Sequence, residues 1–295
     1  MENSQSKVAK LINDQYYTSV ECAEWCLSYI RDEVGWDLKG VALEPCVGRG
    51  AFVLASHNLN LDLVWTTNDL FPDPSFTPDT QENILKLAPN PRPDFILTNP
   101  PFGNANSLAR TSLKHCLKVC DKVAMILPKG SRRVGFLDAQ PDYAHLVDDV
   151  NIPDMSYQLP TGEVRKVSTC LQVWEVKDYE REKIKDGLDL RQDLIYQWDG
   201  GKENYEFCGG EAQFQVCRWG GKRMNTIRQS VERSGSWMSV RVTHPTASVE
   251  EVVKLIQSVD VTDYMERSTS LAAFDIPVWV DRVNRKAVEA GLLPA

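Results

Sequence analysis

Short apolar runs alternate with amphipathic stretches along the first 176 residues of the chain. Apolar runs bounded by turn-forming residues predict buried strands, and apolar residues spaced three and four apart predict helices. Strands are expected at 41–44, 61–68, 94–98 and 122–127, and helices at 20–34, 51–56 and 107–120. Either Thr18 or Ser19 can cap the first helix. The alternation is typical of an α/β fold with a Rossmann-like, doubly wound and mostly parallel sheet.

A hairpin pattern closes this region. Residues 134–150 are mixed in character and helical in part, whereas 151–159 and 164–176 read as two strands across a Pro-Thr-Gly-Glu turn. Strands joined by so short a connection run antiparallel. We therefore expect an antiparallel edge strand beside the parallel strands.

The composition changes after residue 177. Residues 178–193 are dense in charge, as in a solvated helix or a linker. Beyond them, strands are expected at 205–219 and 236–242 and a helix at 248–258. The sequence thus predicts three regions: a flexible amino terminus at 1–15, a first domain at 16–177, and a smaller α+β carboxyl-terminal region at 178–295.

The overall composition is that of an ordinary globular protein, with 42% hydrophobic and 25% charged residues. The sequence lacks an apolar run of about 18 residues, and its amino terminus is polar, so we expect a cytoplasmic protein without membrane contact. The eight cysteines form no Cys-x-x-Cys pair, and the closest pairs have helix-face spacing: Cys22/Cys26 and Cys116/Cys120. We expect reduced thiols and no metal site, although His115 adjoins the second pair.

The stretch Asn99-Pro100-Pro101-Phe102 directly follows the apolar run at 94–98. The carboxyl end of a strand is the usual place for a ligand in an open α/β sheet, and consecutive prolines stiffen the turn. If the Asn99 side-chain oxygen and the Pro100 carbonyl accept the hydrogens of a planar NH2 group, the nitrogen lone pair becomes localised. The motif therefore favours chemistry at a conjugated amino group. The alternative is a purely structural proline turn with a buried Phe.

Two more turns follow predicted strands. Residues 45–52 contain Gly48 and Gly50, which let a ligand approach the backbone closely. The third glycine of a dinucleotide fingerprint is missing, so the turn has fewer means of holding a pyrophosphate. Asp69 ends the second strand, where a carboxylate can accept both hydroxyl protons of a ribose. These positions favour a nucleoside-containing ligand, and a plain structural glycine turn is the alternative.

The formal charge of −8 argues against general affinity for nucleic acid, so the clustering of basic residues matters more than their total. One cluster follows the strand at 122–127, on the rim that carries the Asn-Pro-Pro-Phe turn: Lys129, Arg132 and Arg133. A second cluster is interleaved with Trp219, Met224 and Trp237 and consists of Arg218, Lys222, Arg223, Arg228 and Arg233. It is the best candidate for a nucleic-acid patch, and a solvated charged loop is its alternative.

Four pieces of the chain together resemble the class I S-adenosylmethionine-dependent methyltransferases, specifically the amino-methylating group that modifies adenine N6. They occur in the family's order over residues 15–176 and are Gln15–Thr18, Leu43–Phe52, Asp69-Leu70 and Asn99–Phe102. The order is similar to that of adenine DNA methyltransferases with a carboxyl-terminal recognition domain. Residues 178–295 would then be the target-recognition region, although they match no recognition domain that we can name.

The resemblance implies S-adenosylmethionine as the cofactor. Thr18 would cap its carboxylate, Asp69 would hold its ribose, and Leu70 would lie against its adenine. The family often has an acidic residue before the catalytic strand to hold the adenine amino group, and here Glu82 or Asn83 would have to serve. The implied cofactor-binding set is Tyr17, Thr18, Glu44, Pro45, Cys46, Gly48, Gly50, Phe52, Asp69, Leu70, Asn83 and Asn99.

The resemblance also implies the reaction. The catalytic set would be Asn99, Pro100, Pro101 and Phe102, with Asn99 and Pro100 binding the target amino group and Phe102 stacking on the target base. The expected activity is methylation of N6 of a flipped adenine, in DNA rather than RNA. The alternatives are adenine in RNA, a protein glutamine amide, or a catalytically silent binding subunit.

Overall fold

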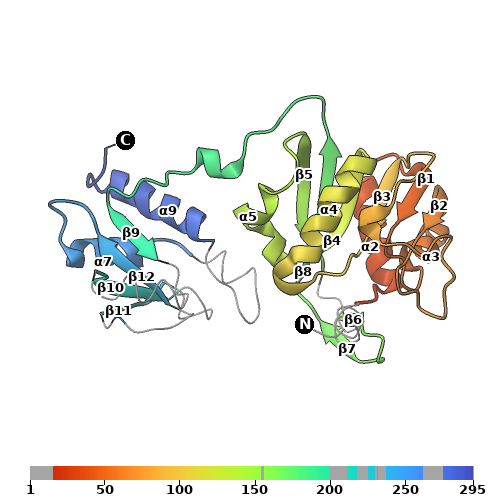
Figure 1. Cartoon of the computed structure of the whole chain (residues 1–295), viewed down its shortest axis with the longest axis horizontal. Coiled ribbons are helices and arrows are strands. Elements are labelled where there is room, and N and C mark those ends of the chain that lie inside the picture. The colour runs from red at the N-terminus through yellow and green to blue at the C-terminus, as the bar shows by residue number, and fades with distance from the viewer. Residues whose placement is uncertain are drawn as a thin grey trace. The chain divides into compact units, whose positions relative to one another are not determined.

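The structure is a computed structural model that describes residues 16–153, 156–198, 211–217, 225–229, 231, 237–261 and 275–294. The chain divides into two compact units, Met1–Glu182 and Lys183–Ala295, and each is described by itself (Figure 1). Residues 178–182 belong to the first unit, so the predicted boundary after 177 lies five residues too early. The Arg181 guanidinium holds them there by donating to the Leu137 and Ala144 carbonyl oxygens at 2.9 Å each.

The first unit contains a six-stranded sheet in the order β2-β1-β3-β4-β8-β5 (Figure 1). Its strands are β1 Lys39–Glu44, β2 Asp62–Thr67, β3 Phe95–Thr98, β4 Lys122–Pro128, β5 Ala144–Asn151 and β8 Thr169–Val176. The first four run parallel to one another, whereas β8 pairs antiparallel with both β4 and β5. This confirms the predicted Rossmann-like, mostly parallel sheet with antiparallel pairing at one edge, where β8 is the strand that runs against the others.

Helices cover both faces of this sheet, because its strands are apolar on both faces. On β3, Phe95 and Leu97 pack with one pair of helices, and Ile96 packs with the other. The first pair is α2 Val20–Asp32 and α3 Ala51–Asn58, and the second is α4 Ser107–Val119 and α5 Val134–Leu137. Ser19 caps α2 by accepting the Cys22 N–H at 3.1 Å, which decides between the two predicted caps.

The predicted hairpin over 151–176 is confirmed only beside its turn, where 156–158 pair antiparallel with 164–166, and is wrong over the rest. The long partner of β8 is β5, which ends at Asn151, where the predicted strand was to begin. The Pro-Thr-Gly-Glu turn instead closes a separate two-stranded sheet of β6 Ser156–Gln158 and β7 Val164–Lys166.

Acidic residues concealed β5 in the sequence. Asp148 and Asp149 interrupt its apolar pattern, and a bulge between Leu146 and Asp148 shifts its register. Both carboxylates have partners, since Asp148 accepts the Tyr29 hydroxyl at 2.9 Å and Asp149 accepts the Arg132 Nε–H at 2.7 Å. Charges that tertiary contacts neutralise are compatible with a strand, but such contacts cannot be read from local periodicity.

The second unit has a four-stranded antiparallel sheet in the order β11-β10-β12-β9. Its strands are β9 Ile195–Trp198, β10 Phe214–Cys217, β11 Ile227–Arg228 and β12 Trp237–Val242, and its helices are α7 Val249–Gln257 and α9 Ile276–Glu289. The predicted smaller α+β region is confirmed, including the strand at 236–242 and the helix at 248–258. The sequence reading missed β9 and α9, and the predicted strand at 205–219 is described only over 211–217.

One apolar core joins this sheet to α7 and α9. Phe214, Met238 and Val240 contribute from the strands, and Trp279 and Val283 contribute from α9. In the described part of the chain, none of the helices combines the length and apolar character that spanning a membrane requires.

Candidate active site

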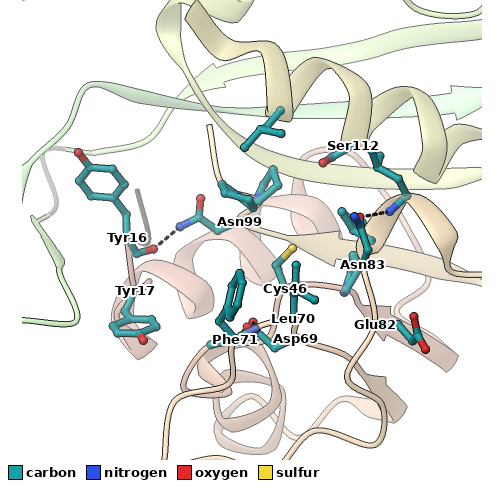
Figure 2. Close-up of a pocket in the computed structure, with 17 residues that line it drawn as sticks. Tyr16, Tyr17, Cys46, Asp69, Leu70, Phe71, Glu82, Asn83, Asn99 and Ser112 are labelled. Atoms are coloured by element: carbon teal, nitrogen blue, oxygen red, sulfur yellow. Dashed lines mark hydrogen bonds between the residues drawn. The ribbon is translucent and has the colours of Figure 1, made fainter. Parts of the chain in front are cut away.

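The strand order creates a crevice at the carboxyl ends of β1 and β3. The chain moves from β1 to β2 on one side and then crosses to β3 on the other, so the sheet order reverses between β1 and β3. Ligands in open α/β sheets bind at such a switch point. The turn after β1 and the Asn-Pro-Pro stretch after β3 both line one pocket there (Figure 2).

Most predicted site residues line this pocket: Tyr17, Pro45, Cys46, Gly48, Asp69, Leu70, Asn83, Asn99, Pro100 and Pro101. Within the described residues, five others do not line it: Thr18, Glu44, Gly50, Phe52 and Phe102. Lining residues absent from the predicted set are Tyr16, Phe71, Glu82, Ile84, Leu85, Leu108 and Ser112. Most of these are apolar side chains from loops and from α4, which carry no recognisable motif.

The glycine turn brings backbone to the pocket edge. Gly48 has φ +52°, and a Cβ atom there would lie 3.0 Å from Cδ1 of Tyr17. Its N–H donates to Asp69 Oδ2 at 2.8 Å, which fixes the turn against the end of β2. The Arg49 Cζ atom lies 4.4 Å from the centroid of the Tyr17 ring, so the arginine limits movement of that ring. Burial and the nearby Asp73 charge raise the pKa of Tyr17 to about 12, so its hydroxyl stays protonated.

Asp69 is the carboxylate predicted to hold a ribose. It is buried, and its second oxygen accepts the Phe71 N–H at 2.9 Å. Burial raises the pKa of Asp69, and the hydrogen bonds from Gly48 and Phe71 oppose that shift. Each carboxylate oxygen can accept a further hydrogen bond, so these contacts leave capacity for ligand hydroxyls.

Asn68 is a structural residue that the motif analysis missed. It is fully buried, and its side chain bonds Pro45 O at 2.9 Å, Glu82 O at 3.0 Å and Glu82 N–H at 2.8 Å. One amide therefore ties together the loops that follow β1 and β2. Asn83 lies beside this tie and accepts the Leu85 N–H at 3.0 Å, so its side-chain oxygen is already engaged.

Asn99 has a defined amide orientation. Its Nδ2 donates to Tyr16 O at 2.8 Å (Figure 2) and to Thr18 Oγ1 at 3.0 Å. Because the Tyr16 carbonyl can only accept, the nitrogen must face it. The Asn99 Oδ1 atom is buried and, among the described residues, has no hydrogen-bond partner. A buried acceptor without a partner is costly unless a ligand supplies the donor.

Phe102 lies outside the pocket lining. It is 7% exposed and packs in the core with Leu113 and other residues of α4. The Tyr16 ring stacks on it, with centroids 5.8 Å apart and an interplanar angle of 18°. Tyr16, whose carbonyl oxygen accepts the Asn99 Nδ2–H, belongs to the described pocket lining, whereas Phe102 does not.

Cys46, the cysteine among the described lining residues, is not an activated thiol. Burial raises the pKa of the Cys46 thiol well above its usual range, and the Asp69 charge adds to the shift. Cys46 therefore remains protonated and is a poor nucleophile. In the described parts of the chain, no group of three or more His, Cys, Asp or Glu side chains is placed to hold a metal ion.

Glu44 makes folding sensitive to pH. It is 3% exposed, and within the described residues its Oε2 has no hydrogen-bond partner. Burial, followed by the Asp69 charge, raises the pKa of Glu44 well above 4.5. The folded state thus holds this proton more tightly than the unfolded state, so Glu44 favours folding at acidic pH. That contribution is lost as the pH rises through the folded-state pKa.

We expect Glu44→Gln to stabilise the ligand-free protein above neutral pH. The amide has no charge to bury, and each kcal/mol gained should raise Tm by roughly 2–4 °C. Thermal unfolding from pH 5 to pH 8 should show a smaller loss of Tm in the variant than in the natural chain. The exposed residue Glu33 provides the control, since Glu33→Gln should leave the pH dependence unchanged. Parallel curves for Glu44→Gln and the natural chain would contradict the assignment.

The basic residues predicted to bind nucleic acid differ in their surroundings. Lys129, Arg132 and Arg133 follow β4, and Arg132 is ion-paired with Asp149 while Arg133 is exposed. In the second unit, Arg228 Nε donates to Gln215 Oε1 at 2.8 Å and its guanidinium lies 4.5 Å from the centroid of the Trp237 ring. The remaining predicted residues lie outside the described part of the chain: Arg218, Lys222, Arg223 and Arg233.

No protein-family profile matches the sequence, and no curated protein matches it either. One similar solved structure is that of a Pyrococcus horikoshii protein described as a putative RNA methyltransferase. It is 14% identical, with 56% of this chain and 89% of that chain covered, at a TM-score of 0.42. TrmN from Thermus thermophilus is 17% identical, covering 54% of this chain and 52% of its own, at a TM-score of 0.37. The 23S rRNA methyltransferase ErmE is 13% identical, covering 58% and 74%, at a TM-score of 0.37. With TM-scores under 0.5, these likenesses carry no weight for function.

Proposed function

We propose that the protein is an S-adenosylmethionine-dependent methyltransferase that acts on the exocyclic N6 amino group of a flipped adenine in DNA. The observation that carries the proposal is Asn99, a pocket-lining residue whose two N–H groups are occupied and whose buried Oδ1 has no partner among the described residues. That arrangement suits a donor such as an amino group. A binding subunit that performs no chemistry would have no need for an oriented, unsatisfied acceptor.

The pocket fits a nucleoside-containing cofactor. Gly48 presents backbone without a side chain, Asp69 supplies a carboxylate for hydroxyl groups, and Leu70 adds an apolar surface. Glu82 and Asn83 also line the pocket, and either can hold a ring amino group, because Asn83 Oδ1 keeps a second acceptor site beside the one taken by the Leu85 N–H. When bound there, S-adenosylmethionine supplies a methyl group made electrophilic by its sulfonium.

The side chains around Asn99 act by positioning rather than by acid–base chemistry. Asn99 Oδ1 accepts one amino hydrogen, and the Pro100 carbonyl accepts the other, which localises the nitrogen lone pair. The raised pKa values of Cys46 and Tyr17 keep both groups protonated, so neither serves as a base at neutral pH. Holding a nucleophile in line with its electrophile can lower a barrier by roughly 7–11 kcal/mol. Positioning can therefore supply a large part of the rate enhancement.

Base flipping limits the affinity that the pocket can provide. Extruding a base requires a few kcal/mol. One aromatic stack returns about 1–3 kcal/mol, and two hydrogen bonds return roughly 1 kcal/mol each. These contributions nearly cancel, so phosphate contacts must supply the net affinity. In an acidic chain those contacts have to come from local clusters.

Tritiated methyl transfer to duplex DNA, single-stranded DNA, RNA and protein, followed by nucleoside and amino-acid analysis, tests the proposal. We expect label in N6-methyladenine from DNA. Label in RNA would identify RNA as the substrate. Label in methylglutamine would identify a protein side-chain amide, which also carries a planar NH2 group, as the substrate. Cofactor binding without transfer to any of the four would indicate a binding subunit.

Two adjacent arginines allow a matched test of phosphate binding. Arg133 is exposed at the rim after β4, whereas the Arg132 guanidinium is occupied by Asp149 and by Asn151 Oδ1 at 2.6 Å. Arg133→Ser should weaken binding to all DNA sequences alike and make the slope of log affinity against log salt shallower by about 0.9. Arg132→Ser should lower Tm but leave the salt slope unchanged. Equal salt slopes in the natural chain, Arg133→Ser and Arg132→Ser would show that this rim does not contact the nucleic acid.

A further inference from the structure

The aromatic ring of the Asn-Pro-Pro-Phe turn is not available to a substrate in this structure. Phe102 is 7% exposed and packs in the core beside Leu113 and Ala109 of α4. Its ring is stacked against Tyr16, with an interplanar angle of 18° and a centroid separation of 5.8 Å. A planar target that reached Phe102 directly would have to displace Tyr16.

The backbone on which Tyr16 lies is held firmly. The Tyr16 carbonyl accepts the Asn99 Nδ2–H at 2.8 Å, which places this residue directly beside the catalytic amide. Next along the chain, the Tyr17 N–H donates to Gln158 O at 2.8 Å, and the Gln158 N–H donates back to Tyr17 O at 3.3 Å. The Tyr16 side chain is half-buried and packs against both cores of the first unit, and the residue belongs to the pocket lining beside Asn99.

The ring and the cofactor-side residues lie on different sides of the amide. Figure 2 shows Asn99 pointing its amide nitrogen toward Tyr16, with the Tyr16 ring on the side of Asn99 away from Asp69 and Leu70. A ligand seated against Asp69 and Leu70 leaves the Tyr16 side of the pocket for a second molecule. A planar amine arriving there would have Asn99 Oδ1 as an acceptor and the Tyr16 ring as a flat surface.

We propose that Tyr16 is the platform on which the target ring stacks while Asn99 Oδ1 accepts its amino hydrogen, with Phe102 supporting Tyr16 from behind. The inference rests on the proposed function and specifies its substrate class: an amino group on an aromatic ring rather than a side-chain amide. Stacking on an aromatic side chain favours any nucleobase, because every base has a π-face. A glutamine side chain has no ring and gains little from this surface.

Replacement of Tyr16 by Leu tests the platform without breaking the amide contact, because Asn99 binds the backbone carbonyl and not the ring. In Tyr16→Leu, the KM for an adenine-containing single-stranded oligodeoxynucleotide should rise about tenfold, while kcat stays within a few-fold. Fluorescence anisotropy of the labelled oligonucleotide, with S-adenosylhomocysteine present, should show a similar loss of affinity. The affinity for S-adenosylhomocysteine itself, measured by calorimetry, should change little. Tyr16→Phe should restore both KM and oligonucleotide affinity.

A tyrosine at the surface provides the control, since Tyr143 is 37% exposed and does not line the pocket. Tyr143→Leu should leave every measured constant unchanged. If the natural chain methylates adenine and Tyr16→Leu keeps its KM and affinity, Tyr16 is not the platform. Tighter oligonucleotide binding by Tyr16→Leu would overturn the inference as well, because the ring would then obstruct the site. If the natural chain methylates no adenine, the proposed function fails. The platform is then judged by oligonucleotide affinity: an unchanged affinity in Tyr16→Leu rejects it, and a loss of about tenfold supports it.

Discussion

Asn99→Ala should reduce kcat for methyl transfer by about 100- to 1,000-fold, the range observed when a single preorganised hydrogen-bonding group is removed from an active site. The substitution deletes the only buried acceptor that the described pocket residues leave without a partner. Because Asn99 bonds to residues 16 and 18 and to no other described group, the cofactor side should be little affected. Calorimetry with S-adenosylhomocysteine should therefore give a dissociation constant within a few-fold of the natural value.

Part of any effect of Asn99→Ala will come from the groups it leaves behind. The Tyr16 carbonyl and the Thr18 hydroxyl each lose a donor, which can destabilise the fold by about 1–3 kcal/mol. Measuring kcat well below the variant's own Tm separates this effect from chemistry. Asn104 is an exposed residue in the next turn, so Asn104→Ala is the matched control and should retain full kcat. If Asn99→Ala keeps most of its kcat, the turn has only a structural role.

The local pattern of apolar residues in the sequence was sufficient to predict the parallel strands of the sheet. The runs at β1, β3 and β4 are apolar on both faces and are bounded by Gly, Pro or Asn, so burial and element type agree. It was insufficient for β5, where Asp148 and Asp149 depend on Tyr29 and Arg132 from distant parts of the chain. It also missed α9, whose buried residues include the polar Asp281 and Asn284.

The candidate site was also predictable from the sequence only in part. Asn99, Gly48 and Asp69 were found because strand ends and positive-φ turns have sequence signatures. Their mutual contacts were not predictable: Asp69 bonds to the Gly48 N–H, and Asn99 is oriented from residues 16 and 18, some eighty positions earlier in the sequence. The role assigned to Phe102 from the motif presumed an open ring face. Tertiary packing places Tyr16 on that face, and no local signal in the sequence reports it.

Gly48→Val should weaken cofactor binding by about tenfold or more. A Cβ atom at Gly48 already lies 3.0 Å from Tyr17 Cδ1, and the branches of valine would extend further into the pocket edge. The Tyr17 ring has little freedom to retreat, because Arg49 lies over it at 4.4 Å and that arginine donates to Asp73 at 3.0 Å. The same substitution strains the turn at φ +52° and so disturbs the N–H that Asp69 accepts. We expect the dissociation constant for S-adenosylhomocysteine to rise by at least roughly tenfold, or about 1.4 kcal/mol.

Strain alone lowers stability, and Gly35 separates that effect from loss of the site. Gly35 has φ +79° and nothing within 4 Å of an added Cβ, and it precedes β1 whereas Gly48 follows it. Gly35→Val should therefore lose stability through backbone strain of about 1–3 kcal/mol yet keep its affinity for S-adenosylhomocysteine. Gly48→Val should lose both. Calorimetric titration of the two variants, each first shown to be folded by circular dichroism, gives the comparison. Undiminished binding by a folded Gly48→Val would place the cofactor away from the turn after β1, and the pocket between β1 and β3 would then need another ligand.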